Sequence, residues 1–114
     1  MTVADPSPPE LFKLGSHEYL AYECADHAEH PPSSIGVRLE RHGNPKFSIC
    51  CTASFVRGKL GYVQTPDIGQ ADSYEERMTI RLFYSSPELQ GFVRDWIECC
   101  YRRYETKARQ TRAA

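Results

Sequence analysis

The stretch from Phe47 to Phe55 constrains the fold of this chain most, because apolar residues occupy every second position. The positions between them carry serine, cysteine or threonine. A period of two sends neighbouring side chains to opposite faces of a strand. The pattern therefore predicts a β-strand with one face in a core and the other in solvent. The apolar members are Phe47, Ile49, Cys51, Ala53 and Phe55.

Four other segments predict strands of the same sheet. Apolar and polar residues alternate in each of them, and turn residues such as Gly58 or Pro32 separate them. The polar stretch 65–76, which contains Pro66 and Gly69, predicts a long loop. The four segments are 17–24, 35–40, 60–64 and 78–84.

A helix is predicted from Pro87 to Lys107. Ser85 or Ser86 can cap it, and Pro87 suits its first turn. Its apolar residues recur at intervals of three and four, which is typical of a helix with one buried face. These residues are Leu89, Phe92, Val93, Trp96, Ile97, Cys100 and Tyr104.

The predicted fold class is α+β: an antiparallel sheet of four or five strands with one long C-terminal helix packed on one face. An uncovered apolar sheet face is unstable, so we expect the helix to lie across the sheet. The residues expected to be buried together are Phe47, Ile49, Phe55, Ile80, Leu82, Phe92, Val93, Trp96 and Ile97.

The length of 114 residues predicts a single domain, 1–114. Residues 1–9 contain three prolines and are expected to form a flexible arm, and residues 108–114 a frayed basic tail. The net charge is −1, but residues 1–30 carry six acidic residues against Lys13, and residues 101–114 carry five basic residues against Glu105. This uneven charge favours weak self-association into a homo-oligomer such as a homodimer.

The five cysteines favour a reducing compartment. Four of them form the adjacent pairs Cys50-Cys51 and Cys99-Cys100, and neighbouring residues on a strand or helix point in different directions. Such pairs do not suit a disulfide framework, so a cytoplasmic protein is expected. No apolar run has the length of a membrane span, so no membrane partner is expected.

Catalysis is not expected from this sequence. It contains no phosphate-binding loop, no nucleophile elbow and no zinc-protease motif. The weak candidates for metal ligands are Cys24, His27 and His30, whose two-residue gaps suit zinc, but no convincing second ligand pair accompanies them. We therefore expect no metal and no cofactor, and a zinc-dependent module is the third hypothesis.

The leading functional hypothesis is a binding module for another protein: an inhibitor, adaptor or accessory protein. Seven tyrosines are an excess for this length, and tyrosine is enriched at protein interfaces. Tyr101 and Tyr104, near the end of the predicted helix, are therefore candidate partner-binding residues.

The alternative hypothesis is single-stranded nucleic-acid binding. The predicted element order is similar to that of the Whirly and PUR-type single-strand binders, which implies a stacking surface on the sheet. Arg81 beside Phe83 would supply a charge and an aromatic ring for such a surface, and both are candidate partner-binding residues. The overall charge of −1 argues against this alternative, because phosphate binding needs a basic excess.

Overall fold

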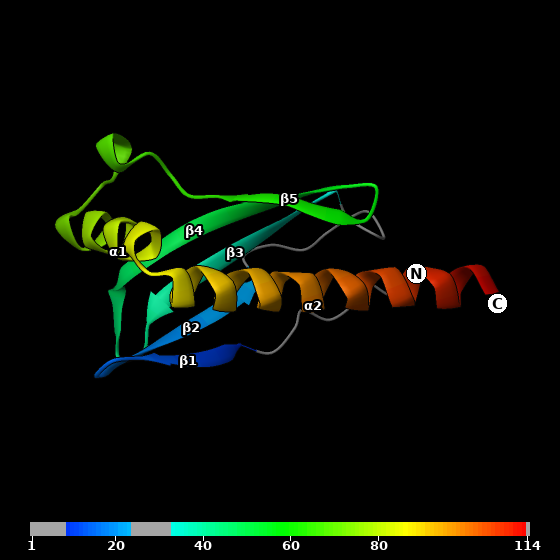
Figure 1. Cartoon of the computed structure of the whole chain (residues 1–114), viewed down its shortest axis with the longest axis horizontal. Coiled ribbons are helices and arrows are strands. Elements are labelled where there is room, and N and C mark those ends of the chain that lie inside the picture. Colours follow the sequence, from blue (N-terminus) through cyan, green and yellow to red (C-terminus); the bar gives the residue numbers. More distant parts are fainter. Residues whose placement is uncertain (1–8, 24–32, 114) are drawn as a thin grey trace.

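The computed structural model describes residues 9–23 and 33–113, which form a five-stranded sheet, two α-helices and a short 3₁₀ helix (Figure 1). Each strand pairs antiparallel with the next one in the chain, so the strand order is β1-β2-β3-β4-β5. The strands are β1 (Glu10–Leu14), β2 (His17–Glu23), β3 (Ser34–Arg41), β4 (Asn44–Val56) and β5 (Lys59–Gln64). The helices are η1 (Ile68–Gln70), α1 (Tyr74–Ser85) and α2 (Pro87–Ala113).

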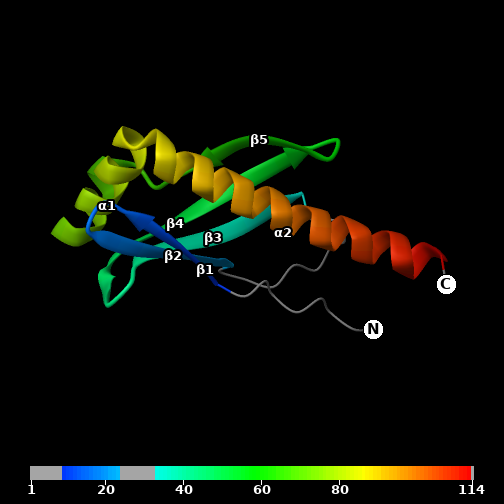
Figure 2. The ribbon, with the colours of Figure 1, turned by 60° about the horizontal axis from the view of Figure 1, so that its bottom comes forward.

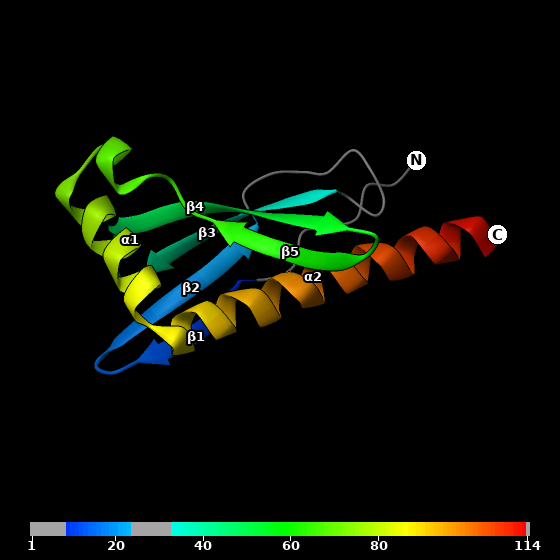
Figure 3. The ribbon, with the colours of Figure 1, turned by 45° about the horizontal axis from the view of Figure 1, so that its top comes forward.

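One face of the sheet forms the core together with both α-helices. Register pairs Val37 with Cys51 and Leu39 with Ile49, and all four of these side chains are buried. Paired residues of an antiparallel sheet share a face, so the apolar positions of β2, β3 and β4 make one continuous surface. Helix α1 packs on β4 at one end of the sheet, and α2 runs across the strands (Figures 2 and 3).

Aromatic contacts dock α2 on the sheet. The ring of Phe92 stacks on Phe12 of β1 with centroids 4.7 Å apart, and Tyr101 stacks on Phe55 of β4 with centroids 4.0 Å apart. The predicted fold class is confirmed: an antiparallel sheet with a long C-terminal helix packed on one face. The C-terminal end of α2 extends beyond the sheet (Figure 1).

The turn predicted at Arg57-Gly58-Lys59 is present as the hairpin between β4 and β5. Arg57 and Gly58 connect the strands and have positive φ angles of 53° and 78°. Two residues of positive φ twist a two-residue hairpin in the direction that its strands require. Glycine adopts this conformation without steric cost, which explains its place at the second position.

The strand predicted for residues 78–84 is wrong, because these residues belong to helix α1. Ile80 and Phe83 are both buried, and their spacing of three places them on the same side of a helix, whereas a strand would separate them. The predicted loop 65–76 also contains η1 and the first turn of α1. Over so short a segment, the spacing of the apolar residues fits both the two-residue period of a strand and the 3.6-residue period of a helix.

Strand β1 is present where the sequence predicted no element. Its residues Phe12 and Leu14 are half-buried against the core, so the sheet reaches five strands without the segment 78–84. Of the predicted flexible arm 1–9, all but Pro9 lies outside the described residues. Three of the residues expected in the core, Phe47, Leu82 and Phe92, are half-buried, and the other six are buried.

Helix α2 continues past Lys107 to Ala113, through most of the segment predicted as a frayed tail. No glycine or proline follows Gly91 in the sequence, and a helix that has formed gains one backbone hydrogen bond with each added residue. Within the described residues, no helix is both long enough and apolar enough to cross a bilayer.

Candidate docking site

Helix α1 begins at a pair of side-chain caps. The Glu76 backbone N–H donates to Oγ of Ser73 at 3.0 Å, and the backbone N–H of Asp72 donates to Oε2 of Glu76 at 3.1 Å. The first bond satisfies a backbone donor that the helix itself leaves unpaired, and the second ties the residue before the cap to the first turn. These caps fix the first turn of α1 close to the end of the connection from β5.

The C-terminal end of α1 is fixed by α2. The side-chain amide of Gln90 donates to the backbone carbonyls of Phe83 and Tyr84, at 2.8 and 3.2 Å. These carbonyls lie in the last turn of α1, where no further backbone N–H group of the helix can donate to them. With Ile80 and Phe83 anchored in the core, Arg81 and Tyr84 are left exposed on the helix surface.

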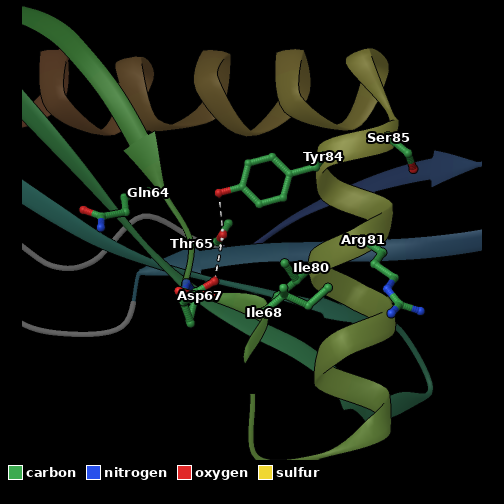
Figure 4. A pocket seen from close by; sticks show the side chains of 9 residues that line it. Gln64, Thr65, Asp67, Ile68, Ile80, Arg81, Tyr84 and Ser85 are labelled. Carbon is green, nitrogen blue, oxygen red and sulfur yellow. Dashed lines mark hydrogen bonds between the residues drawn. The ribbon is translucent and has the colours of Figure 1, made fainter. Parts of the chain in front are cut away.

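A cavity of about 620 Å³ lies between α1 and the connection that leaves β5 (Figure 4). Ile68 supplies exposed apolar surface, and Ile80 lines the cavity as a buried core residue. The volume is within the range of small-ligand sites. Ile68 is 37% exposed and Tyr84 is 60% exposed, so large apolar groups at this cavity face solvent. The lining residues are Gln64, Thr65, Pro66, Asp67, Ile68, Ile80, Arg81, Tyr84 and Ser85.

A hydroxyl bridge joins the two walls of the cavity. Oγ1 of Thr65 donates to the hydroxyl oxygen of Tyr84 at 2.8 Å, and Figure 4 shows this bond spanning from the connection to α1. The same Thr65 hydroxyl lies 3.2 Å from the backbone carbonyl of Pro66.

Two opposite charges border the apolar part of the cavity. In Figure 4, Ile68 and Ile80 lie between Asp67 on the connection and Arg81 on α1. One oxygen of Asp67 accepts the backbone N–H of Gly69 at 3.0 Å and so caps η1. Arg81 makes no hydrogen bond or ion pair with any residue that the structure describes.

Of the four residues expected to bind a partner, only Arg81 is exposed. Phe83, Tyr101 and Tyr104 are all buried in the core. Phe83 therefore does not stack beside Arg81 on a sheet face, as expected for a strand, because both residues lie on α1. Partner binding by these residues stays a prediction, but three of the four now have a packing role that accounts for them.

Tyr104 also has a polar partner within the fold. Its hydroxyl donates to Oε2 of Glu23 in β2 at 2.5 Å. Burial raises the pKa of Tyr104 above its usual value, and the hydrogen bond to Glu23 raises the pKa further, because both favour the protonated phenol. The tyrosine excess near the helix end is thus partly explained by contacts between α2 and the sheet.

The sheet face turned away from the helices carries a polar network. Nε of Arg38 donates to Oε2 of Glu40 at 3.2 Å, and the Tyr22 hydroxyl donates to the same oxygen at 2.6 Å. A second nitrogen of Arg38 lies 3.3 Å from Oγ of Ser48. Arg38 is thus engaged by acceptors of its own chain, which weakens the case for this face as a phosphate-binding platform.

The candidate zinc ligands Cys24, His27 and His30 lie outside the described residues. Within residues 9–23 and 33–113, no group of three His, Cys, Asp or Glu side chains is placed to hold a metal ion. In each adjacent cysteine pair, one member is exposed and the other is buried, and none of these four cysteines forms a disulfide. This difference in exposure agrees with the different directions that the sequence predicts for adjacent residues.

Comparison with protein-family models, with curated proteins and with solved structures finds no significant match for this chain.

Sequence reasoning missed Thr65, Ile68 and Tyr84, because it treated the connection as a plain loop. One signal was available: a serine followed three residues later by a glutamate, Ser73 to Glu76, is the usual start of a capped helix. A helix starting there would have placed Arg81 and Tyr84 on neighbouring parts of one helix surface, beside the preceding connection.

Proposed function

We propose that this protein is a non-catalytic binding module for another polypeptide, and that the partner docks in the cavity between α1 and the connection from β5. One observation carries this proposal: Ile68 and Tyr84 remain exposed at a cavity whose walls are already braced by a hydrogen bond. When a partner covers exposed apolar groups in a preformed cavity, their burial stabilises the complex. We also propose that the module acts inside the cell, on the evidence of its adjacent cysteine pairs.

The bracing of the cavity supports a binding role. The Thr65–Tyr84 bond, the cap at Ser73 and the contacts of Gln90 hold both walls before any partner arrives. A preorganised site loses less conformational entropy on binding than a flexible one. The cavity is therefore suited to recognition of a short segment of another chain.

The experiment is a selection of short peptides from a random displayed library on the full-length protein. The selected peptides are then titrated against Ile68→Glu and against the control Val56→Glu. Ile68 lines the cavity, whereas Val56, 65% exposed at the end of β4, does not. We expect Ile68→Glu to weaken binding by about tenfold or more, since it replaces an apolar contact with a charge, and Val56→Glu to leave binding unchanged.

Two results would contradict the proposal. The first is that no peptide is enriched, or that the enriched peptides bind both variants as well as the wild type. The second is tight binding of labelled single-stranded DNA that weakens steeply with added salt, because that salt dependence reports counterion release from phosphates. The second result would establish the nucleic-acid alternative instead.

A further inference from the structure

The two charges at the cavity do not neutralise each other. No ion pair within 4.0 Å joins Asp67 to Arg81, although both line the same cavity. The cap on η1 uses one oxygen of Asp67 and leaves the other available as an acceptor. The other acidic residues of this region, Asp72, Glu75 and Glu76, are not part of the lining.

We infer that the segment recognised by this cavity is bipolar: an apolar side chain flanked by an acidic residue on the Arg81 side and a basic residue on the Asp67 side. This inference rests on the proposed function and names the chemistry of its partner. It follows from the lining of the cavity, which includes both charges, and from the view in Figure 4, in which Ile68 and Ile80 lie between them. The apolar residue covers Ile68, since Ile80 is already buried, and each charged residue meets the opposite charge on one wall.

The charges act mainly on selectivity. An exposed ion pair contributes little, and each pair should change affinity by about two- to fivefold. A like charge in the same place is unfavourable, so peptides with two acidic or two basic ends meet repulsion at one wall. The apolar contact supplies most of the affinity, and the charges determine which segments are accepted.

The test uses three labelled peptides that share a central leucine and differ only in their end residues: one lysine and one glutamate, two lysines, or two glutamates. Binding is measured by fluorescence anisotropy at low salt. We expect the wild-type protein to bind the mixed peptide about two- to fivefold more tightly than either of the others. We expect Ile68→Glu to weaken its binding to the mixed peptide.

A change of specificity separates the inference from a loss of folding. Arg81→Glu makes both walls acidic, so this variant should prefer the peptide with two lysines. Asp67→Asn keeps an oxygen for the η1 cap but removes the charge, so it should lose the preference for lysine and keep that for glutamate. Arg94→Glu is the matched control, because Arg94 is exposed on α2 and does not line the cavity. The Arg94→Glu variant should bind the three peptides in the same order of affinity as the wild type.

The outcomes distinguish the inference from the proposed function. If the peptides bind and Ile68→Glu weakens their binding, but affinity does not depend on the end charges, the bipolar inference is overturned. The proposed docking site then stands. If Arg81→Glu does not shift preference towards the peptide with two lysines, the inference is overturned as well. If none of the three peptides binds and the library selection also fails, the proposed function falls, and the inference falls with it.

Discussion

Tyr104 and Glu23 join the C-terminal helix to the end of β2 by a hydrogen bond of 2.5 Å, across 81 positions of sequence. The bond lies toward the far end of α2 from its junction with α1, where Gln90 supplies the contacts. It therefore fixes the second half of α2 against the sheet. We expect this contact to contribute to stability in a manner that depends on pH.

Replacing Tyr104 with phenylalanine removes the donor and keeps the ring. We expect the free energy of unfolding at neutral pH to fall by about 1–3 kcal/mol, as for other hydrogen bonds to a charged group. Urea denaturation of the wild type and of Tyr104→Phe measures this change. Tyr74→Phe is the control, because Tyr74 is 60% exposed on α1 and should tolerate the loss of its hydroxyl. Equal losses in the two variants would contradict the role assigned to Tyr104.

The same pair predicts a decline in stability at alkaline pH. The pKa of Tyr104 is raised in the folded state, so the folded protein holds this proton more tightly than the unfolded chain. Its stabilising effect is complete below the unfolded pKa of about 10 and decreases as the pH rises above that value. Burial also raises the pKa of Tyr19, which adds to the decline. Urea titrations above pH 10 should show a shallower decline for Tyr104→Phe than for the wild type, and parallel curves would refute this assignment.

The stack of Phe12 on Phe92 should be measurable as a coupling energy. The rings are 4.7 Å apart and nearly parallel, with an angle of 14° between their planes. A double-mutant cycle with Phe12→Leu and Phe92→Leu should give a coupling of about 0.5–1.5 kcal/mol. The comparison cycle pairs Phe12→Leu with Phe55→Leu, because Phe55 stacks on Tyr101 instead. Similar values in both cycles would mean that Phe12 does not dock β1 through Phe92.

Trp96 is the largest side chain that α2 places in the core, and it is only 4% exposed. Trp96→Ala should lower the free energy of unfolding by about 3–5 kcal/mol, since it removes apolar contacts and leaves a cavity. Chemical denaturation measures this loss, and Arg94→Ala on the exposed side of α2 serves as the control. An unchanged unfolding midpoint in Trp96→Ala would show that α2 does not pack on the sheet as described.

The pattern of apolar residues correctly predicted the elements in which one face is buried at a regular spacing. In β4, every second side chain from Ile49 to Phe55 is buried, and the α2 stripe follows the helical period through Val93 and Trp96. Patterning failed at α1, where the apolar residues of a short segment fit both periods. It failed also at β1, whose five residues are held by contacts with distant segments, such as the stack on Phe92. Such contacts between distant segments cannot be predicted from the local sequence pattern.

The candidate site was less accessible to prediction than the fold. Arg81 was identified from its charge and an aromatic neighbour, but the neighbour at the cavity is Tyr84, and Phe83 is buried instead. A strand and a helix distribute the same residues on different faces, so an error in secondary structure exchanges exposed and buried aromatics. The cavity itself depends on how the connection folds back on α1, which the sequence of either wall does not specify.

The cap of α1 gives the most direct test of its helical structure. Ser73→Ala removes the acceptor for the Glu76 backbone N–H and should lower the free energy of unfolding by about 0.5–2 kcal/mol. Ser73→Asp should retain most of the stability, because a carboxylate also accepts this bond and favours the positive end of the helix dipole. Ser85→Ala, at the opposite end of α1, is the control and should change stability by only a few tenths of a kcal/mol. Hydrogen exchange should accelerate in the first turn of α1 in Ser73→Ala alone. If Ser73→Ala and Ser73→Asp behave alike, the cap does not hold α1, and the wall of the cavity that carries Arg81 and Tyr84 must be fixed by core packing of Ile80 and Phe83.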